Sequence, residues 1–358
     1  MLYHLLFPLA EQISAFNVFR YLTFRSIGAA LTALLIAFIV GPALIGLLED
    51  RQLGQTVRDD PPDRHQEKAG TPTMGGVLIL LALITSTLLW AEWTNPYIWI
   101  VLGVTLGCGV LGFCDDYRKA VRKIPSGIRA RTKLFWQFAI ASAAAIALYL
   151  LPAFDAEISL PLLKDFHPSL GAAYIPVTVL LIVGFSNAVN LTDGLDGLAI
   201  GPVLITAAVI GLFAYVCGHR VLADYLELKY IPGAGTLAIF CTSMLGAGLG
   251  FLWFNTYPAS LFMGDTGSLA LGGALGVMAI VIRQEIVLII AGGIFMVEMF
   301  SVIVQVASFK LRGRRVFRMA PIHHHYELKG WPEPQIIVRF WIISVILGLV
   351  ALSLLKLR

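Results

Sequence analysis

The stretch that decides the fold is Trp93-Thr-Asn-Pro-Tyr-Ile-Trp-Ile-Val-Leu-Gly-Val-Thr-Leu-Gly-Cys-Gly-Val-Leu-Gly-Phe-Cys114, which continues as Asp115-Asp-Tyr-Arg-Lys119. Its first 22 residues carry no charge and are long enough to cross a bilayer as a helix. Asp115 and Asp116 therefore lie at the C-terminal end of a predicted membrane helix, where the helix dipole disfavours negative charge. The Lys and Arg residues that follow, as far as Lys133, supply compensating positive charge.

Two interpretations of this acid pair are open from these residues alone. The local one is a surface ion pair of either acid with Lys119, three or four residues on, which is worth only about 0.3–0.5 kcal/mol. The other is a catalytic or metal-binding carboxylate pair that faces an anionic substrate. The rest of the chain decides between them.

The composition is that of an integral membrane protein. Of 358 residues, 58% are hydrophobic and only 13% are charged, whereas a soluble domain carries about 25% charged residues. We predict an all-α, polytopic protein in which residues 1–358 form a single transmembrane catalytic domain, with an interfacial helix in the first 20 residues. The expected membrane spans number ten, at 23–48, 74–91, 94–114, 134–152, 172–190, 197–217, 234–254, 266–282, 286–309 and 339–356.

The distribution of charge predicts the orientation. Alternate loops, at 49–73, 115–133, 191–196, 255–265 and 310–339, hold 18 of the 26 Lys and Arg residues. By the positive-inside rule these loops are cytoplasmic, and both termini are periplasmic. No loop is long enough to fold alone, so we expect the active site to be formed by the cytoplasmic loops and the helix ends that hold them.

Polar residues gather in these loops, although each has a structural alternative. Lys68 either contacts a phosphate or only precedes the start of a helix. Phe262 either stacks on a base or packs in the core. Asp193, Asp196 or Asp265 could cap a helix, but one cap does not explain Asn187, Asn190, Asp193 and Asp196 together beside lipid, so we predict a hydrogen-bonding pocket. The intramembrane Glu298 is functional or simply hydrogen-bonded, and the sequence leaves that open.

The last cytoplasmic loop contains His323, His324 and His325. Neighbouring residues of a helix differ by about 100° in direction, so the three cannot bind one zinc ion together. We interpret them as donors to phosphate oxygens.

Five aspartates, at positions 115, 116, 193, 196 and 265, thus share a face with most of the basic residues and with five predicted helix N-termini. The basic groups and helix N-termini favour an anion. Acids inside such a site indicate a divalent cation between carboxylates and phosphates, and Mg²⁺ prefers this arrangement. The expected reaction is phosphoryl transfer involving a diphosphate at the membrane surface.

The motifs also resemble those of a known family. They are Asp115-Asp116-Tyr-Arg-Lys119, the run from Asn187 to Gly197, Phe262-Met-Gly-Asp265 and Pro321-Ile-His-His-His325. Together, over essentially the whole chain, they are similar to those of the polyprenyl-phosphate N-acetylhexosamine-1-phosphate transferases, and the His triplet resembles the branch whose donor is UDP-MurNAc-pentapeptide. The resemblance implies a homodimer in the bacterial inner membrane that uses Mg²⁺. The implied reaction transfers phospho-MurNAc-pentapeptide to undecaprenyl phosphate and gives lipid I and UMP.

The resemblance also implies site roles. It assigns Asp265 to Mg²⁺ and, for catalysis, adds Asp115, Asp116, Lys119, His323, His324 and His325. It implies that the substrate contacts are Lys68, Lys133, Asn187, Asn190, Asp193, Asp196, Asn255 and Phe262. Asp115 is the candidate for taking a proton from the acceptor phosphate or for attacking directly, whereas Asp116 supports Asp115 or contacts the metal.

Two alternatives stay open at this point. One is a transferase of another UDP-N-acetylhexosamine. The other is a transporter, whose mark would be ionisable residues distributed through the spans; here the spans hold almost none. No nucleic-acid partner is expected.

Overall fold

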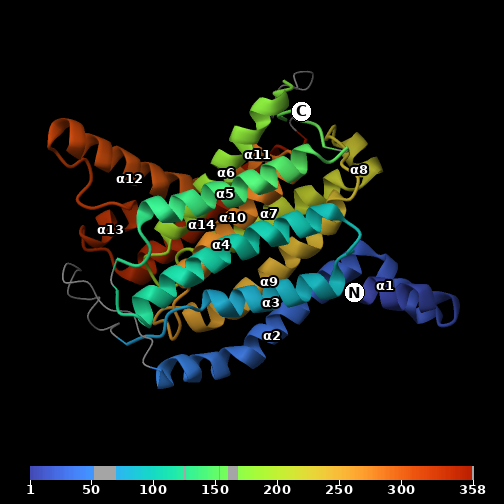
Figure 1. Ribbon diagram of the computed structural model, residues 1–358, viewed down its shortest axis with the longest axis horizontal. Coiled ribbons are helices and arrows are strands. Elements are labelled where there is room, and N and C mark those ends of the chain that lie inside the picture. The colour runs from blue at the N-terminus through green and yellow to red at the C-terminus, as the bar shows by residue number, and fades with distance from the viewer. Residues whose placement is uncertain (52–69, 125, 153, 160–167, 357–358) are drawn as a thin grey trace.

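A computed structural model describes residues 1–51, 70–124, 126–152, 154–159 and 168–356 (Figure 1). The described chain is helical and contains no strand, apart from one isolated bridge between Glu157 and Ser169. The all-α prediction is confirmed. The helices are α1 (Leu2–Leu6), η1 (Phe7–Glu11), η2 (Ser14–Arg20), α2 (Leu22–Asp50), α3 (Gly76–Trp90), α4 (Pro96–Ala120), α5 (Ala130–Tyr149), η4 (Gly171–Ala173), α6 (Tyr174–Thr192), α7 (Ile200–Cys217), α8 (Arg220–Tyr225), η5 (Ala234–Thr236), α9 (Leu237–Asn255), α10 (Gly264–Val281), α11 (Glu285–Ala291), α12 (Gly293–Arg312), α13 (Ile322–Glu327) and α14 (Glu333–Ser353).

Nine helices of the described chain are long and apolar enough to cross a membrane, which fits a multi-pass membrane protein. The predicted span at 74–91 corresponds to α3, which is apolar but has only 15 residues. Nine long helices and one shorter helix thus occupy the positions of the ten predicted spans, and the number of actual crossings stays a prediction.

Two local expectations differ from the structure. The predicted span at 286–309 is divided into α11 and α12 at Gly292, where a side chain would overlap the ring of Phe185. Consecutive glycines, here Gly292 and Gly293, are a common cause of such breaks. The first 20 residues form the short helices α1, η1 and η2 in place of one interfacial helix.

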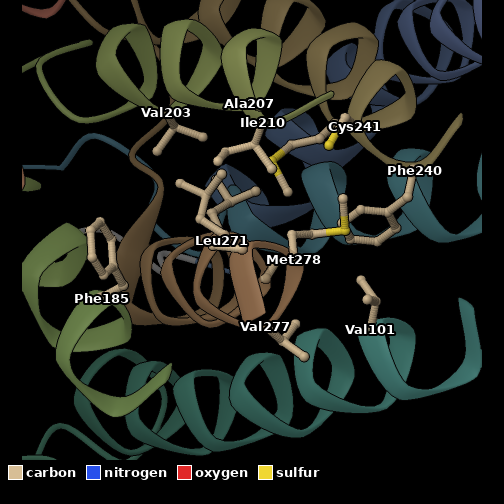
Figure 2. Close-up of a cluster of buried hydrophobic side chains, with 14 of the residues drawn as sticks. Val101, Phe185, Val203, Ala207, Ile210, Phe240, Cys241, Leu271, Val277 and Met278 are labelled. Atoms are coloured by element: carbon tan, nitrogen blue, oxygen red, sulfur yellow. The ribbon is translucent and has the colours of Figure 1, made fainter. Parts of the chain in front are cut away.

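Helix α10 lies at the centre of the bundle, with 89% of its residues buried. Figure 2 shows Leu271 and Met278 of α10 among side chains from the surrounding helices, such as Val101 of α4, Phe185 of α6 and Phe240 of α9. Because α10 is surrounded on all sides, its first residues are held by several helices at once.

Glycine allows these helices to approach closely. A methyl group at Gly112 of α4 would overlap the backbone of Asp265, and one at Gly76 of α3 would overlap the backbone of Gly267. On the α6 side, Gly272 meets the backbone of Phe185 in the same way. Small residues at such contacts let helix backbones touch within a membrane, so the start of α10 is fixed against α3 and α4.

Both chain ends lie at one end of the bundle. The Met1 amine donates to Leu88 O near the C-terminal end of α3, Leu22 contacts Gly235, and Lys356 Nζ donates to Tyr225 O in the segment between α7 and α9. The N and C labels of Figure 1 accordingly lie on the same side. The starts of α2 and α9 therefore lie together, and the charge asymmetry predicts that this end is periplasmic.

Cysteine labelling checks this orientation. In a Cys-free chain, single cysteines at Ser126 or Arg314 should resist an impermeant thiol reagent in intact cells and react after permeabilisation, because both lie in basic loops. As a control, a cysteine at the exposed Asp224, beside the chain ends, should react in intact cells. The opposite labelling pattern would invert the orientation.

Candidate active site

Three carboxylates from two helices converge at the N-terminal end of α10. Asp115 and Asp116 come from the last turns of α4, and Asp265 is the second residue of α10. A ligand atom of each lies within 4.8 Å of the others, which is close enough for one metal ion. The convergence depends on Gly112, which lies one helical turn before Asp116 and allows α4 to touch the backbone of Asp265.

Two lysines neutralise this cluster. Lys119 Nζ lies 2.5 Å from Asp115 Oδ2 and 3.1 Å from Asp265 Oδ2, so its ammonium group bridges two of the three acids. Lys133 Nζ of α5 lies 2.8 Å from the same Asp265 oxygen. The i,i+4 pair considered from the sequence is present, but it forms part of a larger partly buried network in which a cation already lies between carboxylates.

Asp115 is also held by the loop between α4 and α5. Its carboxylate is 2% exposed, and Oδ1 accepts a 2.5 Å hydrogen bond from Ile128 N. The preceding residue is Gly127, whose φ of +56° lies in the left-handed region and whose Cα leaves no room for a Cβ beside Asp115. The loop thus fixes the orientation of Asp115.

Asp116 points toward the start of α10. Its Oδ1 accepts from Asp265 N at 3.0 Å, and its Oδ2 accepts from Thr266 N at 2.9 Å and from the Thr266 hydroxyl at 2.6 Å. Backbone N–H groups in the first turn of a helix have no partner within the helix. Asp116 supplies partners from a different helix.

Asn190 belongs to the same cluster, since its Nδ2 donates to Asp265 Oδ1 at 2.8 Å and to the Ser268 hydroxyl at 2.9 Å. Its amide oxygen accepts from Lys133 Nζ at 3.3 Å. Asn187, one turn earlier on α6, is directed elsewhere: its Nδ2 donates to Gln137 Oε1 at 2.9 Å. Asn187 therefore joins α6 to α5 and does not touch the carboxylates.

Asp196 and Asn255 hold the loop after α6 and the loop between α9 and α10 to each other. Asp196 Oδ2 accepts from Ala259 N at 3.0 Å, while Asn255 accepts from Gly197 N at 2.9 Å and donates to Leu261 O at 2.8 Å. Both are buried.

Burial, together with the negative charges of Asp265 and Asp116, raises the pKa of Asp193 to about 8, which favours its proton-bearing form at neutral pH.

Phe262 has a fixed backbone and a half-buried ring. Its N–H donates to Pro72 O at 2.8 Å, and its carbonyl accepts from Gly75 N at 2.8 Å. Backbone hydrogen bonds therefore join the segment before α3 to the loop before α10. The glycine run at 75–76 is explained by these close backbone contacts.

The three histidines take separate directions. His323 is fully buried, with Nδ1 3.1 Å from Glu298 Oε1, and His324 Nδ1 lies 2.6 Å from Glu327 Oε2. His325 Nδ1 accepts from Arg318 N at 3.0 Å. Among the described groups, His323 Nε2 has no hydrogen-bond partner, and it lies against Gly194 of the loop after α6.

The carboxylate of Glu298 is held between two partners. Its second oxygen accepts from Ile322 N at 2.8 Å, so one buried carboxylate holds both the backbone and the first histidine of α13. Glu298 is thus buried and hydrogen-bonded, and its partner His323 is itself a candidate site residue.

The structure therefore brings six of the candidates together: Asp115, Asp116, Lys119, Lys133, Asn190 and Asp265. Lys68 lies outside the described residues. Sequence reasoning missed Thr266 and Ser268, which contact the acids or their partners, and Gln137, a buried amide that donates to Ser186 at 3.2 Å. A lone Gln within an apolar span was the available signal for Gln137.

Known proteins resemble this chain over its whole length. The family described as glycosyl transferase family 4 matches residues 98–283, which include all three carboxylates, and a signature described as phospho-N-acetylmuramoyl-pentapeptide-transferase signature 1 matches residues 68–80. Proteins named phospho-N-acetylmuramoyl-pentapeptide-transferase are similar over the full length of both chains. Those from Citrifermentans bemidjiense and Geobacter sp. strain M21 are each 60% identical, and that from Pelobacter propionicus is 59% identical.

Proposed function

Since the chain belongs to glycosyl transferase family 4 and, within it, to the phospho-N-acetylmuramoyl-pentapeptide transferases, we propose that Asp265 holds the Mg²⁺ of the reaction and that Asp115 activates the acceptor. The chain is a bacterial inner-membrane enzyme of peptidoglycan synthesis. It transfers phospho-MurNAc-pentapeptide from UDP-MurNAc-pentapeptide to undecaprenyl phosphate, which gives lipid I and UMP.

The donor set suits a hard cation. Asp265 lies in a group of carboxylates whose ligand atoms are within 4.8 Å of one another, and the ammonium of Lys119 already lies between Asp265 and Asp115. Mg²⁺ usually takes one or two carboxylates and completes its coordination with substrate phosphates and water. When bound, it supplies electrostatic stabilisation of the charge that develops on the transferred phosphate.

In this proposal Lys119 and Lys133 also bind the phosphates of the donor. In the cluster described above both are directed at Asp265 Oδ2. A divalent cation at Asp265 would take over the neutralisation of that carboxylate, and the two ammonium groups could then donate to the phosphates of the donor. Fixed cationic donors around a phosphate are a common source of transition-state stabilisation.

Asp115 lies at the edge of the cluster, with Ile128 N on one oxygen and Lys119 on the other. We assign to it the removal of the proton from the acceptor phosphate. The acceptor oxygen then attacks the sugar-linked phosphorus, the bond to the other phosphate breaks, and UMP leaves.

The nucleotide end is assigned to Phe262 and Asp193. The half-buried ring of Phe262 offers a face for uracil, and the side chain of Asp193 supplies a polar group for the edge of the base. Asp196 and Asn255 support these residues through the loop contacts already described. The histidines are assigned to the phosphates and the sugar of the donor, with His323 held by Glu298.

Release of UMP by the purified enzyme tests which donor it uses and whether it needs the acceptor and Mg²⁺. UMP should appear with UDP-MurNAc-pentapeptide only when undecaprenyl phosphate and Mg²⁺ are both present, and UDP-N-acetylglucosamine should be a poor donor. Equal use of both donors would favour the second candidate, a broader UDP-N-acetylhexosamine transferase. The homodimer implied by the resemblance is a separate proposal, which the mass of the detergent-solubilised enzyme checks.

Replacement of Phe262 by Ala should weaken UDP-MurNAc-pentapeptide binding roughly tenfold or more, because stacking on a base is worth about 1–3 kcal/mol. Nucleotide affinity of the purified protein measures this. Phe262→Tyr is the matched control, since it keeps the ring and should keep most of the affinity. Unchanged affinity in Phe262→Ala would assign the ring to packing alone.

A further inference from the structure

We propose that Asp116 is a positioning residue that caps α10 from another helix and thereby orients Asp265, and that it is neither a ligand of the metal nor an acceptor of the reacting proton. The inference deepens the proposed function, because it rests on the proposed Mg²⁺ site at Asp265. It also separates the roles of two adjacent acids.

The hydrogen bonds of Asp116 carry the argument. Its side chain is buried, and its carboxylate accepts three hydrogen bonds, all from the first turn of α10: Asp265 N, Thr266 N and the Thr266 hydroxyl, at 3.0, 2.9 and 2.6 Å. Both oxygens are therefore occupied by donors that belong to the residue proposed to hold Mg²⁺ and to its neighbour. A carboxylate has about four acceptor positions, and the first turn of α10 uses three of those of Asp116, so this side chain is bound mainly to the helix.

The contrast with Asp115 is the second step. Asp115 and Asp265 share the ammonium of Lys119, so each has an oxygen directed toward exchangeable cations. Asp116 accepts from backbone N–H groups, which cannot leave without unwinding α10. The N-terminus of a helix also attracts an anion, and the carboxylate of Asp116 lies at that of α10.

The surrounding backbone is adapted to this cap. Gly264 has φ of +71°, and a Cβ there would come within 2.6 Å of Asp116 Oδ2. Gly112, four residues before Asp116, removes the other obstacle between α4 and α10. Two glycines thus provide the room in which the carboxylate reaches the first N–H groups of α10.

The cap has a measurable consequence for the metal. Without it, the first turn of α10 loses the side-chain acceptor that α4 provides, and Asp265 is held less firmly. Thr266→Val removes one of the three donors and preserves the volume of the side chain. If Asp116 acts as a cap, this variant should weaken metal binding. If Asp116 were itself a ligand, loss of a competing donor would leave metal binding unchanged or tighter.

The experiment uses the full-length enzyme purified in detergent, with Mn²⁺ as the probe and free Mn²⁺ measured by electron paramagnetic resonance. Thr266→Val should raise the Mn²⁺ dissociation constant roughly tenfold, the scale of one hydrogen bond to a charged group. Thr266→Ser keeps the hydroxyl and should restore most of the affinity. Asp116→Asn should have a larger effect, and adding Thr266→Val to it should change little, because both act through one interaction.

Enzyme kinetics add a second readout. In Thr266→Val, kcat should recover as the Mg²⁺ concentration is raised, because the loss lies in metal affinity and not in the chemical step. A simple loss of folded protein would not recover in this way. If Asp116→Asn fails to fold, Thr266→Val and Thr266→Ser still decide the matter.

The outcomes are distinguishable. Wild-type enzyme that binds no Mn²⁺ at Asp265 would overturn the proposed metal site. Wild-type binding that is lost in Asp265→Asn but unaffected by Thr266→Val would leave that site standing and overturn the capping role of Asp116.

Discussion

Asp265→Asn should remove Mg²⁺-dependent transfer, with kcat/KM lower by roughly 10³-fold or more, since a metal contributes several kcal/mol to stabilising the transferred phosphate. Asp265 is the acid on which Lys119, Lys133 and Asn190 all converge. An amide at this position keeps the shape of the side chain and loses the negative charge that attracts the cation. The two lysines would then lack their common partner.

Three measurements define this result: Mg²⁺ titration of UMP release, Mg²⁺ titration of nucleotide binding, and thermal stability. Asp155→Asn is a matched control, because Asp155 pairs with Lys229 at a distance of 2.6 Å in a loop between α5 and α6 and belongs to no proposed site. Asp155→Asn should retain Mg²⁺-dependent transfer. Retention of a normal Mg²⁺ dependence by Asp265→Asn would show that another carboxylate holds the metal.

Asp115→Asn should lower kcat by about 10²–10⁴-fold, the usual contribution of a general base. Mg²⁺-dependent binding of UDP-MurNAc-pentapeptide should be affected much less than in Asp265→Asn. The reason is geometric: Ile128 N and Lys119 hold Asp115 at the edge of the cluster, while Lys133 and Asn190 converge on Asp265.

Single-turnover kinetics and nucleotide affinity, measured side by side in both variants, separate these roles. The assignment requires that Asp115→Asn bind donor and metal normally and transfer slowly. If Asp115→Asn instead loses metal-dependent binding while Asp265→Asn keeps it, the two roles are reversed.

The sequence was informative about which groups gather at one face. The alternation of basic and neutral loops indicated that the end of α4 and the start of α10 face the same side, so the approach of Asp115 and Asp265 could be anticipated. The hydrophobic runs also located every long helix, because membrane spans must satisfy their backbone groups internally.

What the sequence could not provide were contacts set by tertiary packing. Asp116 and Thr266 are 150 positions apart, and nothing in either neighbourhood distinguishes a cap from a metal ligand. Glu298 and His323 lie on different helices, and their pairing depends on how the segment after α12 brings α13 back to Glu298. At the break between α11 and α12, Gly292 lies against Phe185, which belongs to a distant helix.

The glycine contacts of α10 have a consequence for how turnover is organised. Because α3 and α4 meet α10 backbone against backbone, at Gly76 and Gly112, the positions of the three acids are established when the chain folds. Little reorganisation is then left for each catalytic cycle, and preorganised charges of this kind act without a reorganisation penalty at the moment of reaction. The conformational entropy lost in ordering the site is thus lost when the enzyme folds. Each donor then binds to side chains that are already in position.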